Sequence, residues 1–351
     1  MAHLQEVAVN HNLLESQHPR IFMKPELYIQ QAATTFNTTC NSHCLWCSGA
    51  VTGGKEMSIE KAKEVMNMIL YEMRIKDVFI ACSAELTLYS GLLELVKFSD
   101  LKKIPYLRIT QDTNARYIPD GFIESLNSMK NNYWTISISL WGGNSDEWQK
   151  YQGRGDWNQQ VKNIERYLSE LKIPPAFSMP AITEKQKEST LNFIISEIEK
   201  SGYKYVINSN ANSDTYKSYK EQGIVPINVR KFRGYVDQKE EEENGGLAGY
   251  FIHNRNNTSL IEENPYKNKN NCHFPYNSFF VDAAGYVYPC INENNHIESA
   301  IGNVNDYSPF NMKAYYEMIH SEKGMEFWRN NFIKGRFPCD DCKNCPSRDA
   351  Y

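Results

Sequence analysis

Three cysteines within eight residues constrain this chain more than any other feature of its sequence. Cys40, Cys44 and Cys47 form a Cys-x3-Cys-x2-Cys pattern. This spacing lets three thiolates from one tight loop bind three irons of a [4Fe-4S] cluster, and it leaves the fourth iron open to an exogenous ligand. One alternative is zinc, which usually takes four ligands and would find His43 poorly placed as the fourth. The other alternative is a set of reduced surface thiols.

Strand-like and helix-like patterns alternate around and after this triplet. Ser58 is placed to cap a helix whose apolar residues, from Ile59 to Leu70, recur at helical spacing. We expect strands at 28–36, 77–81, 106–110, 134–140, 176–179 and 205–208, and further helices at about 90–99, 120–129, 157–171 and 187–201. Six strands that alternate with helices predict an α/β fold built of parallel βα units.

Composition and charge argue against several classes of function. The 351 residues carry a net charge of −4 and no long basic stripe, so bulk electrostatics predict no nucleic-acid partner. No apolar run approaches the length of a membrane span, and residues 1–30 lack the apolar region of a secretory signal. Eight of the nine cysteines fall in two clusters, which favours metal ligation in a reducing cytoplasm over disulfides.

The second cysteine cluster lies near the C-terminal end and has five members: Cys272, Cys290, Cys339, Cys342 and Cys345. The first two flank a predicted β-hairpin with strands at 278–282 and 286–290. A helix over about 311–330 separates the hairpin from the last three cysteines. The alternative to an iron–sulfur site here is a zinc ribbon-like site.

The triplet and the alternating elements resemble the radical S-adenosylmethionine (SAM) enzymes. That resemblance implies a partial (β/α)6 barrel and a [4Fe-4S] cluster whose open iron chelates SAM. It predicts an N-terminal extension at 1–27, the barrel at 28–230, a polar linker or lid at 231–271 and an appended domain at 272–351. In such barrels the chemistry gathers at the C-terminal ends of the strands.

The same resemblance implies SAM contacts in the first half of the barrel. Trp46 stands where the family carries an aromatic residue near the adenine. In the segment Ala-Cys-Ser-Ala-Glu-Leu, Glu85 keeps the carboxylate of the family's Gly-Gly-Glu-Pro, which binds the SAM ammonium. Cys82 in that segment reads as a packing residue. Asn114 lies in Thr-Asn-Ala, which is similar to the family's Thr-Asn-Gly.

Further contacts are implied in the second half. Ser139 ends a strand similar to the one whose serine approaches the SAM ribose and carboxylate. The family's basic residue aligns with Gln152 or, after a slip of two positions, with Arg154, and we choose Arg154 because a guanidinium matches a carboxylate better. Met179, at the end of the fifth strand, is expected beside the adenosine.

The C-terminal cysteines resemble those of the SPASM and shorter twitch domains that follow radical SAM barrels. Five cysteines exceed the need of one auxiliary [4Fe-4S] cluster and fall short of two. The resemblance therefore implies one auxiliary cluster, held by Cys272, Cys290 and two of the last three cysteines. Cys342 and Cys345 look most like the family's closing pair, and Cys339 is either spare or a replacement for one of them.

The resemblance implies a radical SAM oxidoreductase that cleaves SAM to a 5′-deoxyadenosyl radical and abstracts hydrogen from a C–H bond. The auxiliary cluster would handle the second electron, and a flavodoxin or ferredoxin would supply the first. We expect a small polar metabolite as substrate, dehydrogenated or otherwise modified in natural-product biosynthesis. The alternative is a maturase that epimerises or cross-links a ribosomally synthesised peptide, and the third possibility is a non-catalytic metal scaffold.

Overall fold

A computed structural model of the chain describes residues 29, 31–44, 54–80, 84–105, 107–153, 155–207, 218–219, 222–231, 278–288 and 300–328. These residues belong to two compact units. The first unit draws on residues 1–34, 57–78 and 263–351, and the second draws on residues 35–56 and 79–262. The first βα segment groups with the C-terminal part of the chain in this division, and the boundaries expected at 230 and 272 stay a prediction.

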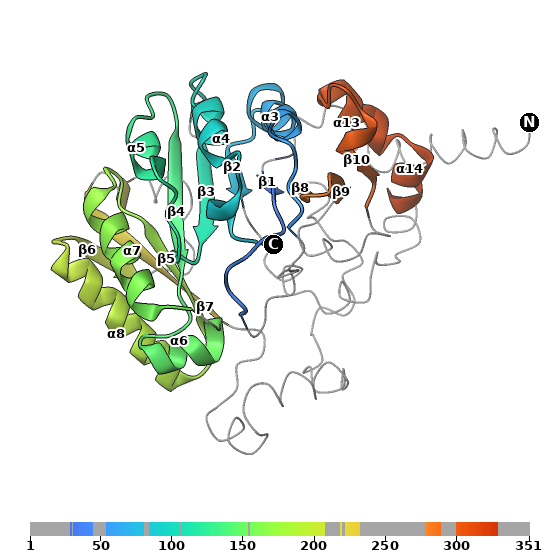
Figure 1. The fold of residues 1–351 in the computed structure, drawn as a ribbon. Coiled ribbons are helices and arrows are strands. Elements are labelled where there is room, and N and C mark those ends of the chain that lie inside the picture. The colour runs from blue at the N-terminus through green and yellow to red at the C-terminus, as the bar shows by residue number, and fades with distance from the viewer. Residues whose placement is uncertain are drawn as a thin grey trace, which may run out of the picture. The chain divides into compact units, whose positions relative to one another are not determined.

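The second unit is built on parallel strands in the order β3-β4-β5-β7-β6 (Figure 1). They are β3 (Arg108–Thr113), β4 (Tyr133–Ser139), β5 (Ala176–Ala181), β6 (Lys204–Ile207) and β7 (Ile224–Lys231). Every residue of β5 is buried, as expected for a strand in the middle of a parallel sheet. This arrangement confirms the expected α/β class.

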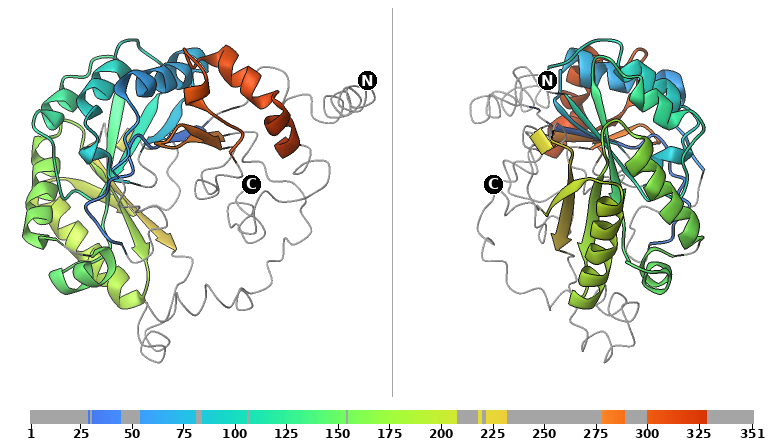
Figure 2. Two further views of the ribbon diagram at one scale, coloured as in Figure 1. Left: turned by 45° about the vertical axis from the view of Figure 1, so that its right-hand side comes forward. Right: turned by 90° about the vertical axis from the view of Figure 1, so that its left-hand side faces the viewer.

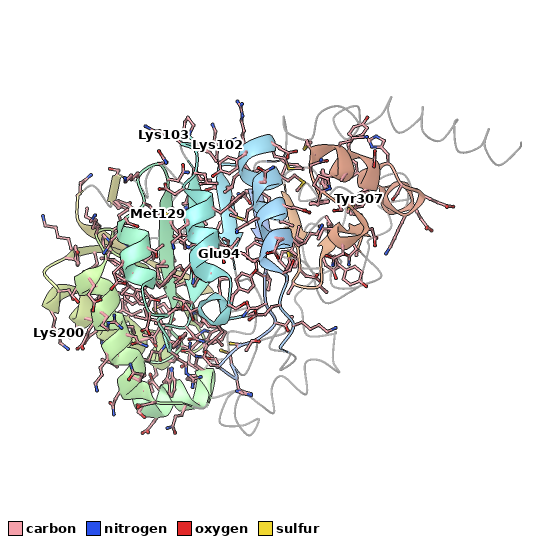
Figure 3. All side chains as sticks on the ribbon, turned by 45° about the horizontal axis from the view of Figure 1, so that its top comes forward. Glu94, Lys102, Lys103, Met129, Lys200 and Tyr307 are labelled. Carbon is pink, nitrogen blue, oxygen red and sulfur yellow. The ribbon has the colours of Figure 1, made fainter. Side chains whose placement is uncertain are left out.

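Helices lie along one side of these strands (Figure 2). They are α4 (Leu92–Ser99), α5 (Phe122–Asn127), α6 (Ser145–Gln152), α7 (Trp157–Glu170) and α8 (Glu184–Lys200). Side-chain caps fix the starts of α6, α7 and α8 at Asn144, Asp156 and Thr183. Charged side chains such as Lys102, Lys103 and Lys200 are exposed to solvent (Figure 3).

The first unit places strands of both ends of the chain in one sheet, in the order β10-β9-β8-β1-β2. Its strands are β1 (Gln31–Thr34), β2 (Asp77–Ile80, of which the first two residues belong to this unit), β8 (Ser278–Val281), β9 (Tyr286–Tyr288) and β10 (Gly302–Asn303). β8 runs parallel to β1 and antiparallel to β9, which confirms the expected hairpin. Gly285 forms its turn at φ +88°, where an added Cβ would lie 2.7 Å from Asn303 Oδ1.

The helices of the first unit are α3 (Ile59–Asn67), continued by the π-helical turn Met68–Glu72, then α13 (Met312–Ile319) and α14 (Glu322–Trp328). Ser58 caps α3 as expected, and its side chain accepts a hydrogen bond from Lys61 N at 3.3 Å. The expected single helix over 311–330 is two helices, because the chain turns at His320 and Ser321. Ser321 Oγ then accepts a hydrogen bond from Gly324 N at 3.1 Å.

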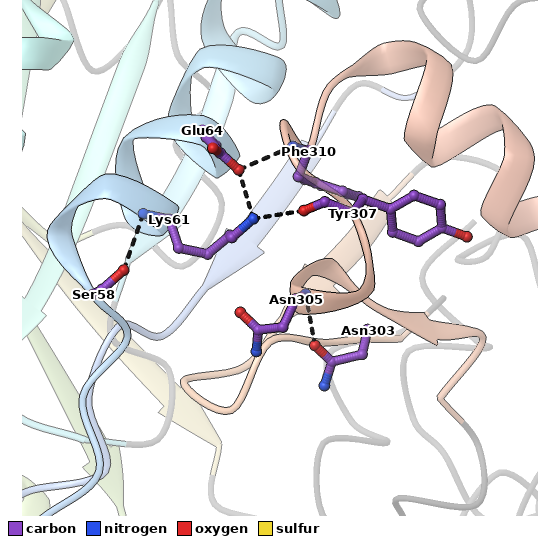
Figure 4. Close-up of polar contacts among 7 residues, drawn as sticks. All are labelled: Ser58, Lys61, Glu64, Asn303, Asn305, Tyr307 and Phe310. Carbon is purple, nitrogen blue, oxygen red and sulfur yellow. Dashed lines mark hydrogen bonds and ion pairs between the residues drawn. The ribbon is translucent and has the colours of Figure 1, made fainter.

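Helix α3 contacts the C-terminal segment through a set of residues that we call the Lys61 cluster: Lys61, Glu64, Tyr307 and Phe310 (Figure 4). Lys61 Nζ donates to Glu64 Oε2 at 2.6 Å and to the carbonyl of Tyr307 at 2.8 Å. Glu64 Oε2 also accepts from Phe310 N at 2.9 Å. Further along the helix, Glu72 accepts from Met312 N at 2.7 Å.

Strand β7 and helix α6 were not expected from the sequence. Strand β7 lies between β5 and β6, although Pro226 in its middle lacks the N–H that a strand with two neighbours normally donates. Helix α6 forms in a largely polar stretch that its cap and first-turn acids favour. The expected extension at 1–27 lies outside the described residues, as does all but residue 231 of the linker at 231–271.

Candidate functional site

The loop that follows β1 carries the first two cysteines of the triplet, whereas Cys47 and Trp46 lie outside the described residues. Both described thiols are partly exposed. Cys40 Sγ lies 3.4 Å from Ser42 N and 3.9 Å from Asn114 Nδ2, and Cys44 Sγ lies 4.0 Å from the carbonyl oxygen of Gln152. Cys40 thus accepts an N–H from its own loop and one from Asn114, as the sulfur ligands of iron–sulfur clusters do.

Because Cys47 is outside the described part, the two thiols do not by themselves make up a metal site. Among the described residues, no group of three or more His, Cys, Asp or Glu side chains is arranged to hold a metal ion. A backbone hydrogen bond of 3.3 Å from His43 N to the carbonyl of Gln152 fixes the loop between Cys40 and Cys44. The residue after Gln152, Gly153, has φ +85°, and a Cβ there would lie 2.8 Å from the carbonyl oxygen of His43.

Glu85 lies at the centre of a buried polar group that we call the Glu85 cluster: Glu85, Thr87, Thr113 and Asn114. Its carboxylate accepts four hydrogen bonds, from Thr87 N at 3.2 Å, Thr87 Oγ1 at 2.7 Å, Thr113 Oγ1 at 2.8 Å and Asn114 N at 2.7 Å. Only 2% of Glu85 is exposed. Burial raises the pKa of this carboxyl above its ordinary value, and the four hydrogen bonds oppose the rise.

These contacts join the segment after β2 to the end of β3, as expected for residues at the C-terminal ends of parallel strands. The backbone N–H of Glu85 also donates to the carbonyl of Thr39 at 3.0 Å, and Asn37 Nδ2 donates to the carbonyl of Glu85 at 3.0 Å. The chain just before the cysteine triplet is therefore held by the same residue. That Glu85 binds the SAM ammonium stays a prediction, because both carboxylate oxygens already accept hydrogen bonds from the protein.

Asn114 connects the Glu85 cluster to the cysteine loop. Its Nδ2 donates to Asn41 Oδ1 at 2.7 Å and to Ser42 Oγ at 3.0 Å. Its own carbonyl accepts from Gln160 Nε2 at 2.5 Å, which fixes the segment against helix α7. The structure thus brings three of the expected site residues together: Cys40, Glu85 and Asn114.

Ala115 adopts a left-handed backbone conformation with φ +57°. This is the position at which the sequence resembles a family glycine, and glycine is the residue that reaches this conformation without strain. The carbonyl of Ala115 accepts a hydrogen bond from Asn163 Nδ2 at 3.0 Å, and its side chain is fully buried. Alanine therefore adopts here a conformation that is usual for glycine.

Arg116 is a site residue that the sequence analysis did not single out. Its Nη1 donates to the carbonyl of Asn41 and, at 3.1 Å, to Ser42 Oγ. Its guanidinium carbon lies 5.2 Å from the centre of the Trp148 ring. Burial lowers the pKa of Arg116, and the negative charges of Cys40, Cys44 and Glu85 oppose that effect.

The other expected SAM contacts lie at the ends of β4 and β5. Ser139 Oγ accepts a hydrogen bond from Trp141 Nε1 at 3.1 Å, and the carbonyl of Ser139 accepts from Gln152 Nε2 at 3.1 Å. Met179 is fully buried in β5. Arg154 lies outside the described residues, whereas Gln152, the alternative alignment, is buried with an Oε1 that has no hydrogen-bond partner within the described ranges.

The auxiliary-cluster cysteines, Cys272, Cys290, Cys339, Cys342 and Cys345, all lie outside the described residues. The structure does describe the hairpin between the first two. Its turn is held by Asp282, whose Oδ1 accepts from Ala284 N at 2.9 Å and from Tyr286 N at 2.8 Å. The helices in the described part of the chain are too short or too polar to cross a membrane.

Comparison with known proteins supports an iron–sulfur domain in the C-terminal part of the chain. Residues 272–346 match the SPASM family model, described as an iron-sulfur cluster-binding domain. No curated protein matches the chain in sequence.

Several solved structures share the fold, and two of them are described here. SuiB of Streptococcus suis bound to the precursor peptide SuiA has a TM-score of 0.55 and 13% identity, over 93% of this chain and 71% of that one. Native anSMEcpe with bound AdoMet and the Cp18Cys peptide has a TM-score of 0.50 and 16% identity, over 90% and 86%. These likenesses show the fold, an α/β fold with a parallel sheet, as the alternation of strands and helices led us to expect. Near the C-terminal end, residues 272–346 resemble the SPASM type of iron–sulfur domain.

Proposed function

We propose that this chain is a radical SAM enzyme with two [4Fe-4S] clusters, one on each cysteine set. The observation that carries the proposal is the joint position of the Cys40–Cys44 loop, Glu85 and Asn114 at the ends of neighbouring strands. When bound, the first cluster and SAM supply a 5′-deoxyadenosyl radical. The protein's own part is to hold, orient and shield the reactants.

Each residue then has a proposed role. Cys40, Cys44 and Cys47 hold the first cluster, and Asn114 orients their loop through Asn41 and Ser42. Glu85, Ser139 and Arg154 bind the polar groups of SAM, and Trp46 and Met179 pack against its adenosine. Glu85 meets this role only if one of its protein donors gives way to the SAM ammonium, because all four now point at its carboxylate.

The SPASM match supports an auxiliary cluster on Cys272, Cys290 and two of Cys339, Cys342 and Cys345. We propose that this cluster accepts the second electron when the substrate radical is oxidised, which would make the enzyme an oxidoreductase. Replacement of Cys272 or Cys290 by alanine should then leave cleavage to 5′-deoxyadenosine and lower product formation by orders of magnitude. Full product formation by a folded variant without this cluster would instead assign the domain a structural role.

For the substrate we propose a peptide. The two structures described above hold peptides, SuiA and Cp18Cys, and this observation favours the peptide maturase over the small polar metabolite that the sequence analysis ranked first. The reaction we propose is a modification at a C–H bond of that peptide, by epimerisation, cross-linking or dehydrogenation.

The test is anaerobic reconstitution with iron, sulfide, SAM and dithionite, with 5′-deoxyadenosine as the readout. We expect cleavage by the wild type and none by the variant with Cys40, Cys44 and Cys47 all changed to alanine. One arm then supplies short peptides, including any that a neighbouring gene is found to encode, and another supplies aminocyclitols or sugars. A mass change of the peptide, with faster SAM cleavage, in the peptide arm alone supports the maturase. A mass change of the small molecule, with faster SAM cleavage, in the other arm alone supports the small polar metabolite as substrate.

A further inference from the structure

Arg116 has no role in the function proposed so far, although it is built into the cysteine loop. Its guanidinium contacts two residues that stand between Cys40 and Cys44, through the carbonyl of Asn41 and the hydroxyl of Ser42. Both contacts are made by the same nitrogen, Nη1. Arg116 therefore forms hydrogen bonds with the short chain segment that links Cys40 to Cys44.

Residues on two sides of the Arg116 guanidinium fix its position. On one side it lies over the ring of Trp148, which is fully buried. On another side, Gly155 leaves the space that the guanidinium fills, since a Cβ on Gly155 would overlap Arg116 Nη2. An aromatic ring, a glycine and two oxygen acceptors fix an otherwise flexible side chain.

The positive charge of Arg116 lies where it can act on the charge of a cluster bound to the cysteine loop. Three thiolates bound to iron give this loop a net negative charge, and the one-electron reduction of a cluster adds another negative charge to it. Arg116 is half-buried, so solvent screens its field less than that of a surface arginine. Net charge and hydrogen bonds near a cluster set its reduction potential.

We propose that Arg116 is a positioning residue that holds the Cys40–Cys44 loop and raises the reduction potential of the cluster bound there. The electron itself comes from an external one-electron donor, a reduced flavin or iron–sulfur protein in the cell and dithionite in the test. This inference rests on the proposed function, because it requires a cluster on Cys40, Cys44 and Cys47.

The experiment is a potentiometric titration of the reconstituted full chain, followed by electron paramagnetic resonance. The variant with all three N-terminal cysteines changed to alanine identifies the signal of the first cluster as the one it lacks. Arg116→Gln should keep the iron content and lower the midpoint potential of that signal by about 59 mV, which is a tenfold fall in the ratio of reduced to oxidised cluster. Arg116→Lys keeps the charge and should stay near the wild type.

Gly155→Ala provides a second route to the same result, because it keeps the arginine and displaces its guanidinium. We expect a lower potential here too, and this variant decides the matter if Arg116→Gln fails to hold its cluster. An unchanged potential in Arg116→Gln and Gly155→Ala, or an equal fall in Arg116→Lys and Arg116→Gln, would overturn the inference. A triple-cysteine variant that lacks no signal would instead overturn the proposed function.

Discussion

Two polar groups hold this protein together in different ways. The Glu85 cluster joins three loop segments of the second unit around a carboxylate that is 2% exposed and accepts four hydrogen bonds. The Lys61 cluster joins helix α3 to the C-terminal segment of the first unit by side chains that are 16% and 28% exposed (Figure 4). Both contain a glutamate that accepts a backbone N–H from a distant segment.

The two clusters differ in whether water can take the place of a lost hydrogen-bond partner. If Glu64 is lost, water can reach the groups that it leaves, so the expected cost is small. If Glu85 is lost, four donors stay buried without an acceptor, and each unpaired group costs free energy. Burial thus makes the Glu85 cluster the more sensitive of the two, and the predictions below test that ranking.

Glu85→Ala should have the largest effect. Loss of the common acceptor should lower the free energy of unfolding by about 3 kcal/mol or more, because four donors lose their partner in a dry site. Denaturant unfolding under anaerobic conditions measures this. Glu85→Gln is the matched control and should lose less, since it keeps the size and one acceptor oxygen. A loss under about 1 kcal/mol in Glu85→Ala would contradict the ranking.

The same substitution should weaken SAM binding by more than tenfold, a loss of about 1.5–3 kcal/mol. Equilibrium binding to the reconstituted protein measures this, with iron content determined on the same samples. Unchanged affinity with unchanged iron would show that the carboxylate serves only the protein's own loops.

A pH series should show the burial of Glu85 directly. Folding raises the pKa of this group from its ordinary value of 4.5, so the folded state binds more protons above that pH. The stability that Glu85 contributes is therefore present below pH 4.5 and lost as the pH rises through the folded-state pKa. Between those two pKa values the wild type should lose stability relative to Glu85→Gln, by about 1.4 kcal/mol for each step of one in pH. A constant difference between the two proteins would contradict a raised pKa.

Glu64→Ala should cost about 1 kcal/mol, because Phe310 N loses its acceptor in a half-exposed place. Thermal unfolding measures the loss, and Glu64→Gln is the control that keeps an acceptor oxygen. A cost as large as that of Glu85→Ala would break the comparison, because exposure would then not explain the difference.

Ala115→Gly should have the smallest effect of all. Glycine relieves the strain at φ +57°, worth about 1 kcal/mol, but removes a buried methyl worth about 0.8 kcal/mol. The net change in the free energy of unfolding should therefore be near zero. Ala115→Val is the contrasting variant and should be clearly destabilising, because a branched side chain fits neither the backbone conformation nor the space. Equal stability of the glycine and valine variants would contradict the strained turn.

The sequence was sufficient for features that depend on local pattern. The cap at Ser58, the alternation of strands and helices and the hairpin around Gly285 all follow from short-range signals. Strand β7 was missed because Pro226 argues against a central strand, and its place is decided by pairing with β5 and β6.

The site divides in the same way. The cysteine triplet, Glu85 and Asn114 could be predicted as site residues because each belongs to a short motif. Arg116 was missed because its surroundings, Trp148 and Gly155, lie more than thirty residues away in the chain and meet it only after folding. The one local signal was a basic residue directly after the Thr-Asn-Ala segment, and that signal is weak by itself.

The most direct test of the whole account is the iron content of the anaerobically reconstituted protein. Two [4Fe-4S] clusters predict about eight irons per chain, and about four in the variant with Cys40, Cys44 and Cys47 changed to alanine. That variant should keep the auxiliary cluster's spectrum and lose all SAM cleavage. About four irons together with bound zinc in the wild type would contradict the proposal of an auxiliary cluster. Equal iron in the wild type and the variant would contradict the proposal of a cluster on Cys40, Cys44 and Cys47.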